Sequence, residues 1–182
     1  MKTDDVHCVG LLMRAADFAA RKHKDQRRKD PERTPYINHP IGVANILAEE
    51  GSVTDSITLA SALLHDTVED TDATFEQLEK LFGAEIKAVV AEVTDDHRDS
   101  QAVRKQKQID TAASKSHRAK LVKLADKLYN VRDLERSTPV GWSEQRKKEY
   151  FKWALAVVDQ MRGSCAAIED QLDQVFRRNG VL

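Results

Sequence analysis

The sequence has few residues that interrupt helices, with 7 glycines and 4 prolines among 182 residues. We find no convincing alternation of apolar and polar residues, which is the pattern of a half-buried strand. A chain of this length is large enough to bury a core of its own. These features predict an all-α fold, and we expect residues 1–182 to form a single compact domain.

Three further absences narrow the class of protein. Nowhere do 18 apolar residues run together, and the first residues contain no apolar signal-peptide core, so we expect a cytoplasmic protein. The two cysteines, Cys8 and Cys165, are far apart in the sequence, so we expect both to be buried free thiols. With 29 basic and 30 acidic residues the net charge is −1, so we expect no nucleic-acid or membrane partner.

Apolar residues recur at helical spacing along most of the chain. Three of the four prolines lie in the connector 25–40, which should be an ordered loop. The polar segment 95–116 is expected to be a looser helix or a mobile loop. The predicted helices span about 5–23, 40–51, 54 or 55 through 66, 74–83, 84–93, 120–134, 143–162 and 164–178.

The most informative stretch is residues 64–71, Leu-His-Asp-Thr-Val-Glu-Asp-Thr. His65 and Asp66 offer a metal ion one imidazole nitrogen and one carboxylate oxygen. If the stretch is helical, Glu69 lies four residues after His65 and Asp70 four after Asp66, so one side of the helix carries all four. A metal ion beside acidic groups can activate water, so the stretch indicates hydrolysis.

Two more candidate ligands are His39, just before an expected helix start, and Asp126, inside an apolar helical pattern where a buried carboxylate needs a partner. Together with His65 and Asp66 they would form a site of two nitrogens and two oxygens. Such a site suits Mn²⁺, Fe²⁺ or Zn²⁺ better than Ca²⁺ or Mg²⁺. Simpler explanations exist for each alone: the histidine could cap a helix, and the aspartate could pair with a neighbouring lysine at 123 or 127.

In order and spacing, these four residues resemble the metal-binding signature of the HD-domain phosphohydrolases. The stretches 36–40, 65–71 and 123–130 look like the hydrolase domain of the RelA/SpoT alarmone enzymes. With no room for a synthetase or regulatory domain, the chain is similar to the small stand-alone animal SpoT homologs of that family. The resemblance covers about residues 11–176 and implies an HD-domain helical bundle.

The resemblance also implies roles for particular residues. It implies one divalent ion per chain, Mn²⁺, held by His39, His65, Asp66 and Asp126. Glu69 and Asp70 match the catalytic acidic pair, which would orient and deprotonate the attacking water and assist the leaving group. Their simpler explanation is the end of a helix in solvent.

A phosphorylated substrate needs cations and polar contacts. Arg28 and Lys29 match the family's basic motif, and both can bind phosphate oxygens. Further substrate contacts are expected from Tyr36, Asn130, Arg146 and Tyr150. The remaining histidines are expected at the surface: His7, His23, His97 and His117.

The reaction that the resemblance implies is removal of the 3′-pyrophosphate of guanosine 3′,5′-bis(diphosphate), or ppGpp, to give GDP and pyrophosphate. One alternative is removal of the 2′-phosphate of NADPH to give NADH, because both substrates carry phosphate on a secondary ribose hydroxyl beside a purine. A second alternative is a catalytically silent nucleotide sensor, although all six metal and acid positions are filled. The sequence does not predict the oligomeric state.

Overall fold

The structure is a computed structural model that describes residues 3–182, with side chains described from His7 onward. Within this range the backbone is helical apart from loops and one isolated antiparallel bridge between Arg27 and Pro35. The prediction of an all-α fold is confirmed. None of the helices in the described range combines the length and the apolar composition needed to cross a bilayer.

The helices agree with most of the predicted segments. The polar segment after residue 95 contains a regular helix, α7, which begins after a Ser100 cap. A capping box formed by Thr74 and Gln77 starts α5. In chain order the elements are α1 (Thr3–Lys22), α2 (Asn38–Asn45), the π-helical turn η1 (Ile46–Glu50), α3 (Ser56–Leu64), α4 (Thr67–Asp70), α5 (Phe75–Phe82), α6 (Ala84–Val93), α7 (Gln101–Ala112), α8 (His117–Arg136), α9 (Glu144–Asp159) and α10 (Ala166–Arg178).

One helix is interrupted where the sequence predicts continuity. Residues 64–71 do not form one helix: α3 ends at Leu64, His65 and Asp66 make a turn, and α4 is a single turn that starts at Thr67. The Thr67 hydroxyl donates a hydrogen bond of 2.7 Å to the Leu64 carbonyl and so competes with the helical backbone pattern at this point. The four chemically important side chains therefore come from a turn and a short helix, not from one face of a long helix.

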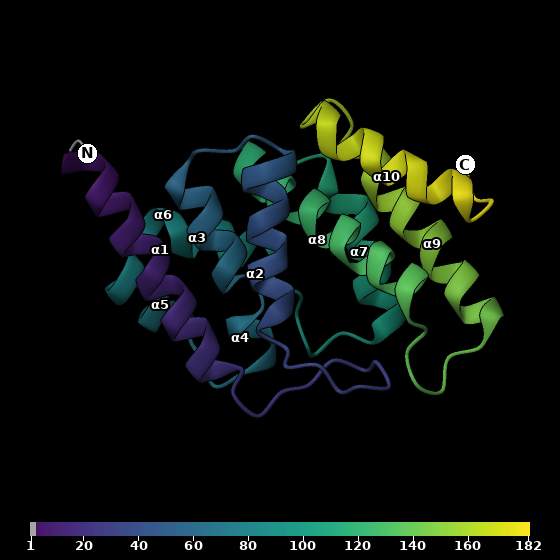
Figure 1. Cartoon of the computed structure of the whole chain (residues 1–182), viewed down its shortest axis with the longest axis horizontal. Helices are drawn as coiled ribbons and strands as arrows, with labels where there is room; N and C mark the ends of the chain where they lie inside the picture. The colour runs from purple at the N-terminus through teal and green to yellow at the C-terminus, as the bar shows by residue number, and fades with distance from the viewer. Residues whose placement is uncertain (1–2) are drawn as a thin grey trace.

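Helix α8 is the central element of the fold (Figure 1). It packs against α2, α3, α6, η1, α9 and α10, so apolar residues on most of its surface are buried. A second apolar cluster joins α3 to α1, α5 and α6 on the N-terminal side of the molecule. The helices that carry the candidate metal ligands thus meet where α2, the end of α3 and α8 are in contact.

Helices α2 and α8 approach closely at Gly42. A Cβ atom at this position would lie 2.0 Å from Cε2 of Tyr129, which is far inside van der Waals contact. Only glycine lets the two backbones come this near without a shift of the tyrosine ring. The close approach brings His39, one turn before Gly42, next to Asp126, one turn before Tyr129.

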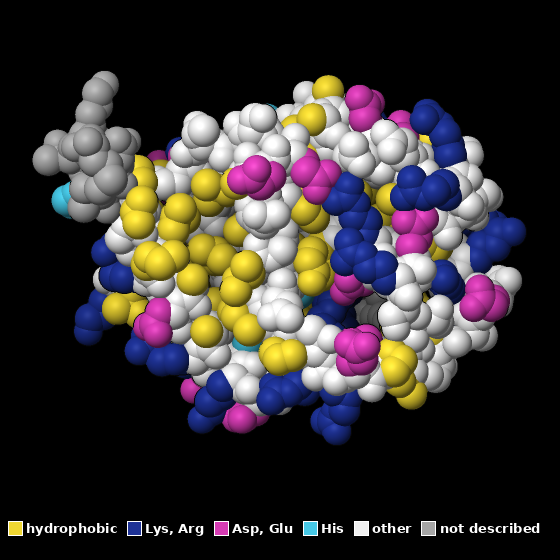
Figure 2. All heavy atoms as spheres, in the orientation of Figure 1, with side chains coloured by type: hydrophobic (Ala, Val, Ile, Leu, Met, Phe, Trp, Pro, Cys, Tyr) yellow, Lys and Arg dark blue, Asp and Glu magenta, His cyan; other side chains and the backbone are white. Residues whose placement is uncertain are grey.

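The outer side of α1 differs from expectation at Cys8. Figure 2 shows hydrophobic side chains gathered over α1, α2 and α3. Val9 and Met13 of α1 and Ile41 of α2 are exposed. Cys8 lies in the same part of α1 and is exposed, so the prediction of a buried thiol is wrong there, while Cys165 is half-buried. The first helix packs through one face only, which leaves the cysteine on its outer side.

Candidate functional site

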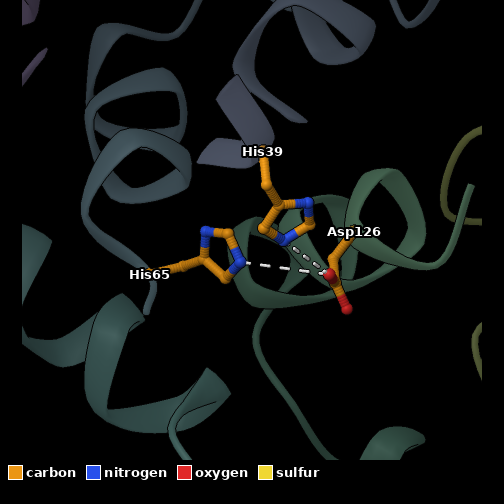
Figure 3. A group of neighbouring side chains, drawn as sticks. All are labelled: His39, His65 and Asp126. Atoms are coloured by element: carbon orange, nitrogen blue, oxygen red, sulfur yellow. Dashed lines mark ion pairs between the residues drawn. The ribbon is translucent and has the colours of Figure 1, made fainter. Parts of the chain in front are cut away.

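Three of the four predicted metal ligands, His39, His65 and Asp126, converge at one point (Figure 3), and Asp66 lies beside them. His39 comes from the first turn of α2, His65 and Asp66 from the turn after α3, and Asp126 from the middle of α8. His39 Nε2 lies 3.2 Å from Asp126 Oδ1 and 3.5 Å from Asp66 Oδ2. His65 Nε2 lies 3.1 Å from Asp66 Oδ2 and 3.9 Å from Asp126 Oδ1. Two ring nitrogens and two carboxylate oxygens therefore face a common centre.

The chemistry of these groups fits a divalent cation. His65 donates from Nδ1 to the Ala62 carbonyl at 2.8 Å, which directs Nε2 toward the carboxylates. That Nε2 is buried and has no hydrogen-bond partner among the described residues, although Asp66 is near. A lone pair aimed at two carboxylates is favourable only when a proton or a metal cation lies between them.

The electrostatics of the cluster favour a positive charge at its centre. Burial acts to raise the pKa of Asp126, but Lys127, 2.9 Å away, and the two imidazoles hold that pKa far below its usual range. Burial acts to lower the pKa of His65, yet the carboxylates, mainly Asp66, raise it to about 9. The site thus attracts either a proton or a metal ion, and the two compete for the same nitrogen.

Glu69 lies beside this centre and lines the same cavity. Its Oε2 accepts a hydrogen bond of 2.8 Å from the backbone N–H of Asp95. Burial, and to a lesser extent the nearby charges of Asp66 and Asp95, raises the pKa of Glu69 to about 7. A carboxyl group with this pKa can exchange a proton near neutral pH.

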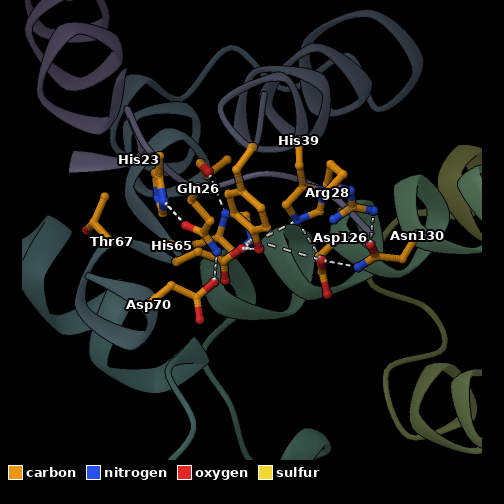
Figure 4. Close-up of polar contacts among 12 residues, drawn as sticks. His23, Gln26, Arg28, His39, His65, Thr67, Asp70, Asp126 and Asn130 are labelled. Carbon is orange, nitrogen blue, oxygen red and sulfur yellow. Dashed lines mark hydrogen bonds and ion pairs between the residues drawn. The ribbon is translucent and has the colours of Figure 1, made fainter. Parts of the chain in front are cut away.

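Asp70 occupies a different position from its neighbour. Its side chain is exposed and lines a shallow depression beside the end of α1, not the cavity that contains Glu69. Its Oδ2 accepts a hydrogen bond of 2.9 Å from Gln26 Nε2 (Figure 4). Glu69 thus lines the small cavity and Asp70 lies at its outer side, with a carboxylate oxygen still within 4.8 Å of one of Glu69.

Three of the predicted substrate residues surround the ligand cluster. Tyr36 donates from its hydroxyl to Asp66 Oδ2 at 2.6 Å, and Asn130 donates to Asp126 Oδ1 at 2.6 Å. Arg28 donates to Asn130 at 2.9 Å and lies over the Tyr36 ring, 5.7 Å from its centroid. All three line the cavity and orient the groups around it.

The other predicted substrate residues are farther from the ligand cluster. Arg146 and Tyr150 line a second cavity of about 560 Å³, and this cavity shares Asp95 and Gln108 with the smaller one of about 160 Å³ around the ligands. The two cavities therefore adjoin. Lys29 is exposed and lines neither cavity.

Sequence reasoning missed two buried groups at the site. Lys123 lines the small cavity one turn before Asp126, is 4% exposed and forms no ion pair within the described range. It stands in the same apolar pattern that singled out Asp126, so that signal was available. The prediction that His23 lies at the surface is wrong, because the ring is 1% exposed under the connector, whereas His7, His97 and His117 are exposed as expected.

Comparisons with known proteins agree with this geometry. Residues 15–156 match the HD domain family, and this segment contains all four converging ligands and both acidic residues. The chain is 58% identical to the guanosine-3′,5′-bis(diphosphate) 3′-pyrophosphohydrolase MESH1 of Danio rerio, over 95% of this chain and 96% of the relative. It is 56% identical to the protein of the same name in Homo sapiens, over 93% and 95%.

A solved structure has the same fold. It was described under the statement that a metazoan ortholog of SpoT hydrolyzes ppGpp and plays a role in starvation responses. The TM-score is 0.93, with 53% sequence identity, over 94% of this chain and 97% of the other. The chain belongs to the HD domain family.

Proposed function

We propose that this protein is a metal-dependent hydrolase that removes the 3′-pyrophosphate of ppGpp to give GDP and pyrophosphate. The observation that carries the proposal is the convergence of His39, His65, Asp66 and Asp126 beside Glu69 in one small cavity. The names of the relatives, which cover nearly the same length, support the choice of ppGpp.

The four converging residues would hold one divalent ion. Their imidazole nitrogens and carboxylate oxygens suit Mn²⁺, Fe²⁺ or Zn²⁺, and we propose Mn²⁺ because the family resemblance implies it. Such an ion, when bound, lowers the pKa of water and neutralises charge on a phosphate group. The hydroxyl of Tyr36 and the amide of Asn130 keep Asp66 and Asp126 in the orientation that binding requires.

Glu69 would take the proton of the attacking water. Its Oε2 is held by the Asp95 N–H, and Oε1, 3.8 Å from the Arg104 guanidinium, would accept the proton. The water oxygen forms a bond to the phosphorus nearer the ribose, the bond from that phosphorus to the 3′-oxygen breaks, and the leaving oxygen takes up a proton. Asp70, with a carboxylate oxygen within 4.8 Å of one of Glu69, would act with it in orienting the attacking water.

The substrate's negative charge would be matched by Arg28 and Lys123, which both line the small cavity. A volume of about 160 Å³ accommodates a diphosphate group but not a whole nucleotide. The adjoining cavity presents the rings of Tyr150 and Trp153 and the guanidinium of Arg146, which suit a base and a further phosphate. The nucleoside would therefore extend toward α9.

The test is product analysis with ppGpp and NADPH in parallel, using metal-depleted protein and protein loaded with Mn²⁺. We expect GDP and pyrophosphate from ppGpp with the loaded protein and no turnover after metal removal. NADH and phosphate as the faster products would reassign the substrate to NADPH. Absence of turnover of either nucleotide by the loaded protein would refute the proposal.

A further inference from the structure

Three side chains outside the small cavity form a chain of hydrogen bonds that ends on the acidic pair (Figure 4). His23 Nδ1 lies 2.6 Å from Gln26 Oε1, and Gln26 Nε2 donates to Asp70 Oδ2 at 2.9 Å. The first two residues belong to the segment that leaves α1, and the last to α4, 44 positions farther along the chain. The chain of bonds thus fastens the connector to the short helix that carries the catalytic acids.

The direction of each bond follows from the chemistry of the groups. An ionised carboxylate only accepts, so the Gln26 amide must turn its N–H toward Asp70 and its oxygen toward His23. That oxygen requires a proton on Nδ1 of the imidazole. Burial lowers the pKa of His23, so the ring is neutral and carries this one proton. The orientation of the glutamine amide is therefore determined from both ends.

The backbone gives Gln26 a fixed position. Its N–H donates to the His23 carbonyl at 3.0 Å, and its carbonyl accepts from the Tyr36 N–H at 3.1 Å. The His23 ring is 1% exposed and packs on the Tyr36 ring with centroids 5.0 Å apart. A side chain held in this way can hold an exposed carboxylate in one rotamer.

Burying the His23 ring also has a cost in free energy. Its Nε2 is buried and has no hydrogen-bond partner within the described part of the chain. An apolar ring of similar size would avoid that cost, so a purely structural role does not account for a histidine here. Its Nδ1 proton, which reaches Gln26, is what an apolar ring would lack.

We propose that Gln26 is a positioning residue that holds the Asp70 carboxylate for the reaction, and that His23 fixes the orientation of Gln26. Among the described residues, Gln26 is the one side-chain donor to the Asp70 carboxylate. This inference rests on the proposed function, because it assigns Asp70 a place in the hydrolysis. It adds two residues that act through Asp70 and touch neither the substrate nor the metal ligands.

The experiment measures kcat and KM of the Mn²⁺-loaded protein on whichever nucleotide it hydrolyses. Gln26→Ala should lower kcat about ten-fold or more, the effect of losing a hydrogen bond to a charged group, and leave KM within about two-fold. His23→Phe should do the same. His23→Asn keeps a donor near the position of Nδ1 and should recover most of the activity.

A double-mutant cycle separates positioning from general damage. In an Asp70→Asn background, Gln26→Ala should cause no further loss of kcat, because the residue it acts through is already altered. The matched control is Lys22→Ala, which breaks the neighbouring 2.8 Å ion pair between the end of α1 and Asp72. We expect this control to keep the kcat of the wild type.

Each outcome decides between the claims. Equal loss from Gln26→Ala in both backgrounds, or an equal loss in the Lys22→Ala control, would overturn the positioning role. An active wild type with unchanged kcat in Gln26→Ala would overturn this inference alone. A wild type inactive on both nucleotides would overturn the proposed function and this inference with it.

Discussion

Replacing Lys123 with methionine should stabilise the metal-free protein while weakening substrate binding. Lys123 is 4% exposed and has no ion-pair partner in the described part of the chain. Burial lowers its pKa to about 8, against 10.5 in an unfolded chain. A difference of roughly 2.5 pKa units corresponds to about 3 kcal/mol of unfolding free energy that the charged amine costs at pH 7. Methionine fills a similar volume and removes that cost.

The sign of the pH dependence follows from the lowered pKa. Below pH 8 both states are protonated and the full cost is present. As the pH rises from 8 to 10.5 the folded state loses its proton first, so the cost disappears. The gain from Lys123→Met should therefore fall from about 3 kcal/mol at pH 7 to about 1 kcal/mol at pH 10.

Urea unfolding of chelator-treated protein at the two pH values measures this gain. Lys120→Met, on the same helix one turn earlier, is the matched control and should change the unfolding free energy by less than about 0.5 kcal/mol. In the Mn²⁺-loaded enzyme, Lys123→Met should raise KM about ten-fold or more, because a phosphate group loses a cation. Destabilisation at pH 7, or an equal gain at both pH values, would refute the reasoning.

Three further predictions concern the acid and the ligand cluster. Glu69→Gln should lower kcat by about 10²-fold or more with Mn²⁺ binding retained, as measured by turnover and calorimetry. Burial raises the pKa of Glu69 to about 7, and a cation bound beside it would lower that pKa. A plot of log kcat against pH should therefore rise through an acidic limb centred at or below about pH 7. Gly42→Ala should cost about 1–3 kcal/mol of unfolding free energy and weaken Mn²⁺ binding, since the added Cβ pushes the Tyr129 ring and separates α2 from α8.

These three predictions have clear contrary outcomes. Wild-type kcat in the glutamine variant would remove Glu69 from the reaction, and a limb centred above pH 8 would mean that another group titrates. For the glycine variant, calorimetry of Mn²⁺ binding to folded protein separates the two effects. Unchanged affinity would show that the close approach of the helices does not set the spacing of the ligands.

Helical periodicity is a local property, so most helices could be predicted from the sequence. The break after Leu64 could not, because it depends on a threonine hydroxyl that competes with a backbone bond, and the residues still carry helical spacing. The burial of His23 could not be predicted either. It results from packing under the connector and against the Tyr36 ring, which no local pattern records.

The convergence of the four candidate ligands was predictable because chemistry restricts which residue types can form a metal site. Two histidines and two aspartates in unusual settings stand out in a sequence, whereas a glutamine or a lysine has many other uses. The sequence suggests Lys123 only as a possible partner of Asp126, but Lys127 makes that contact at 2.9 Å. The three-dimensional arrangement was needed to show that Lys123 faces the cavity without a partner in the described range.

The connector between α1 and α2 explains why an ordered loop is needed at this site. Tyr36 orients a predicted metal ligand, Gln26 holds Asp70, and Arg28 brings a cation over the cavity. Arg28 is itself bound to Asp133 at 2.8 Å, so a phosphate would have to share its guanidinium with that carboxylate. The three contacts lie on one short segment, and displacement of any part of it would disturb ligand, acid and cation together. This coupling favours a rigid connector that is formed before the substrate binds, because an ordered segment does not lose conformational entropy at each turnover.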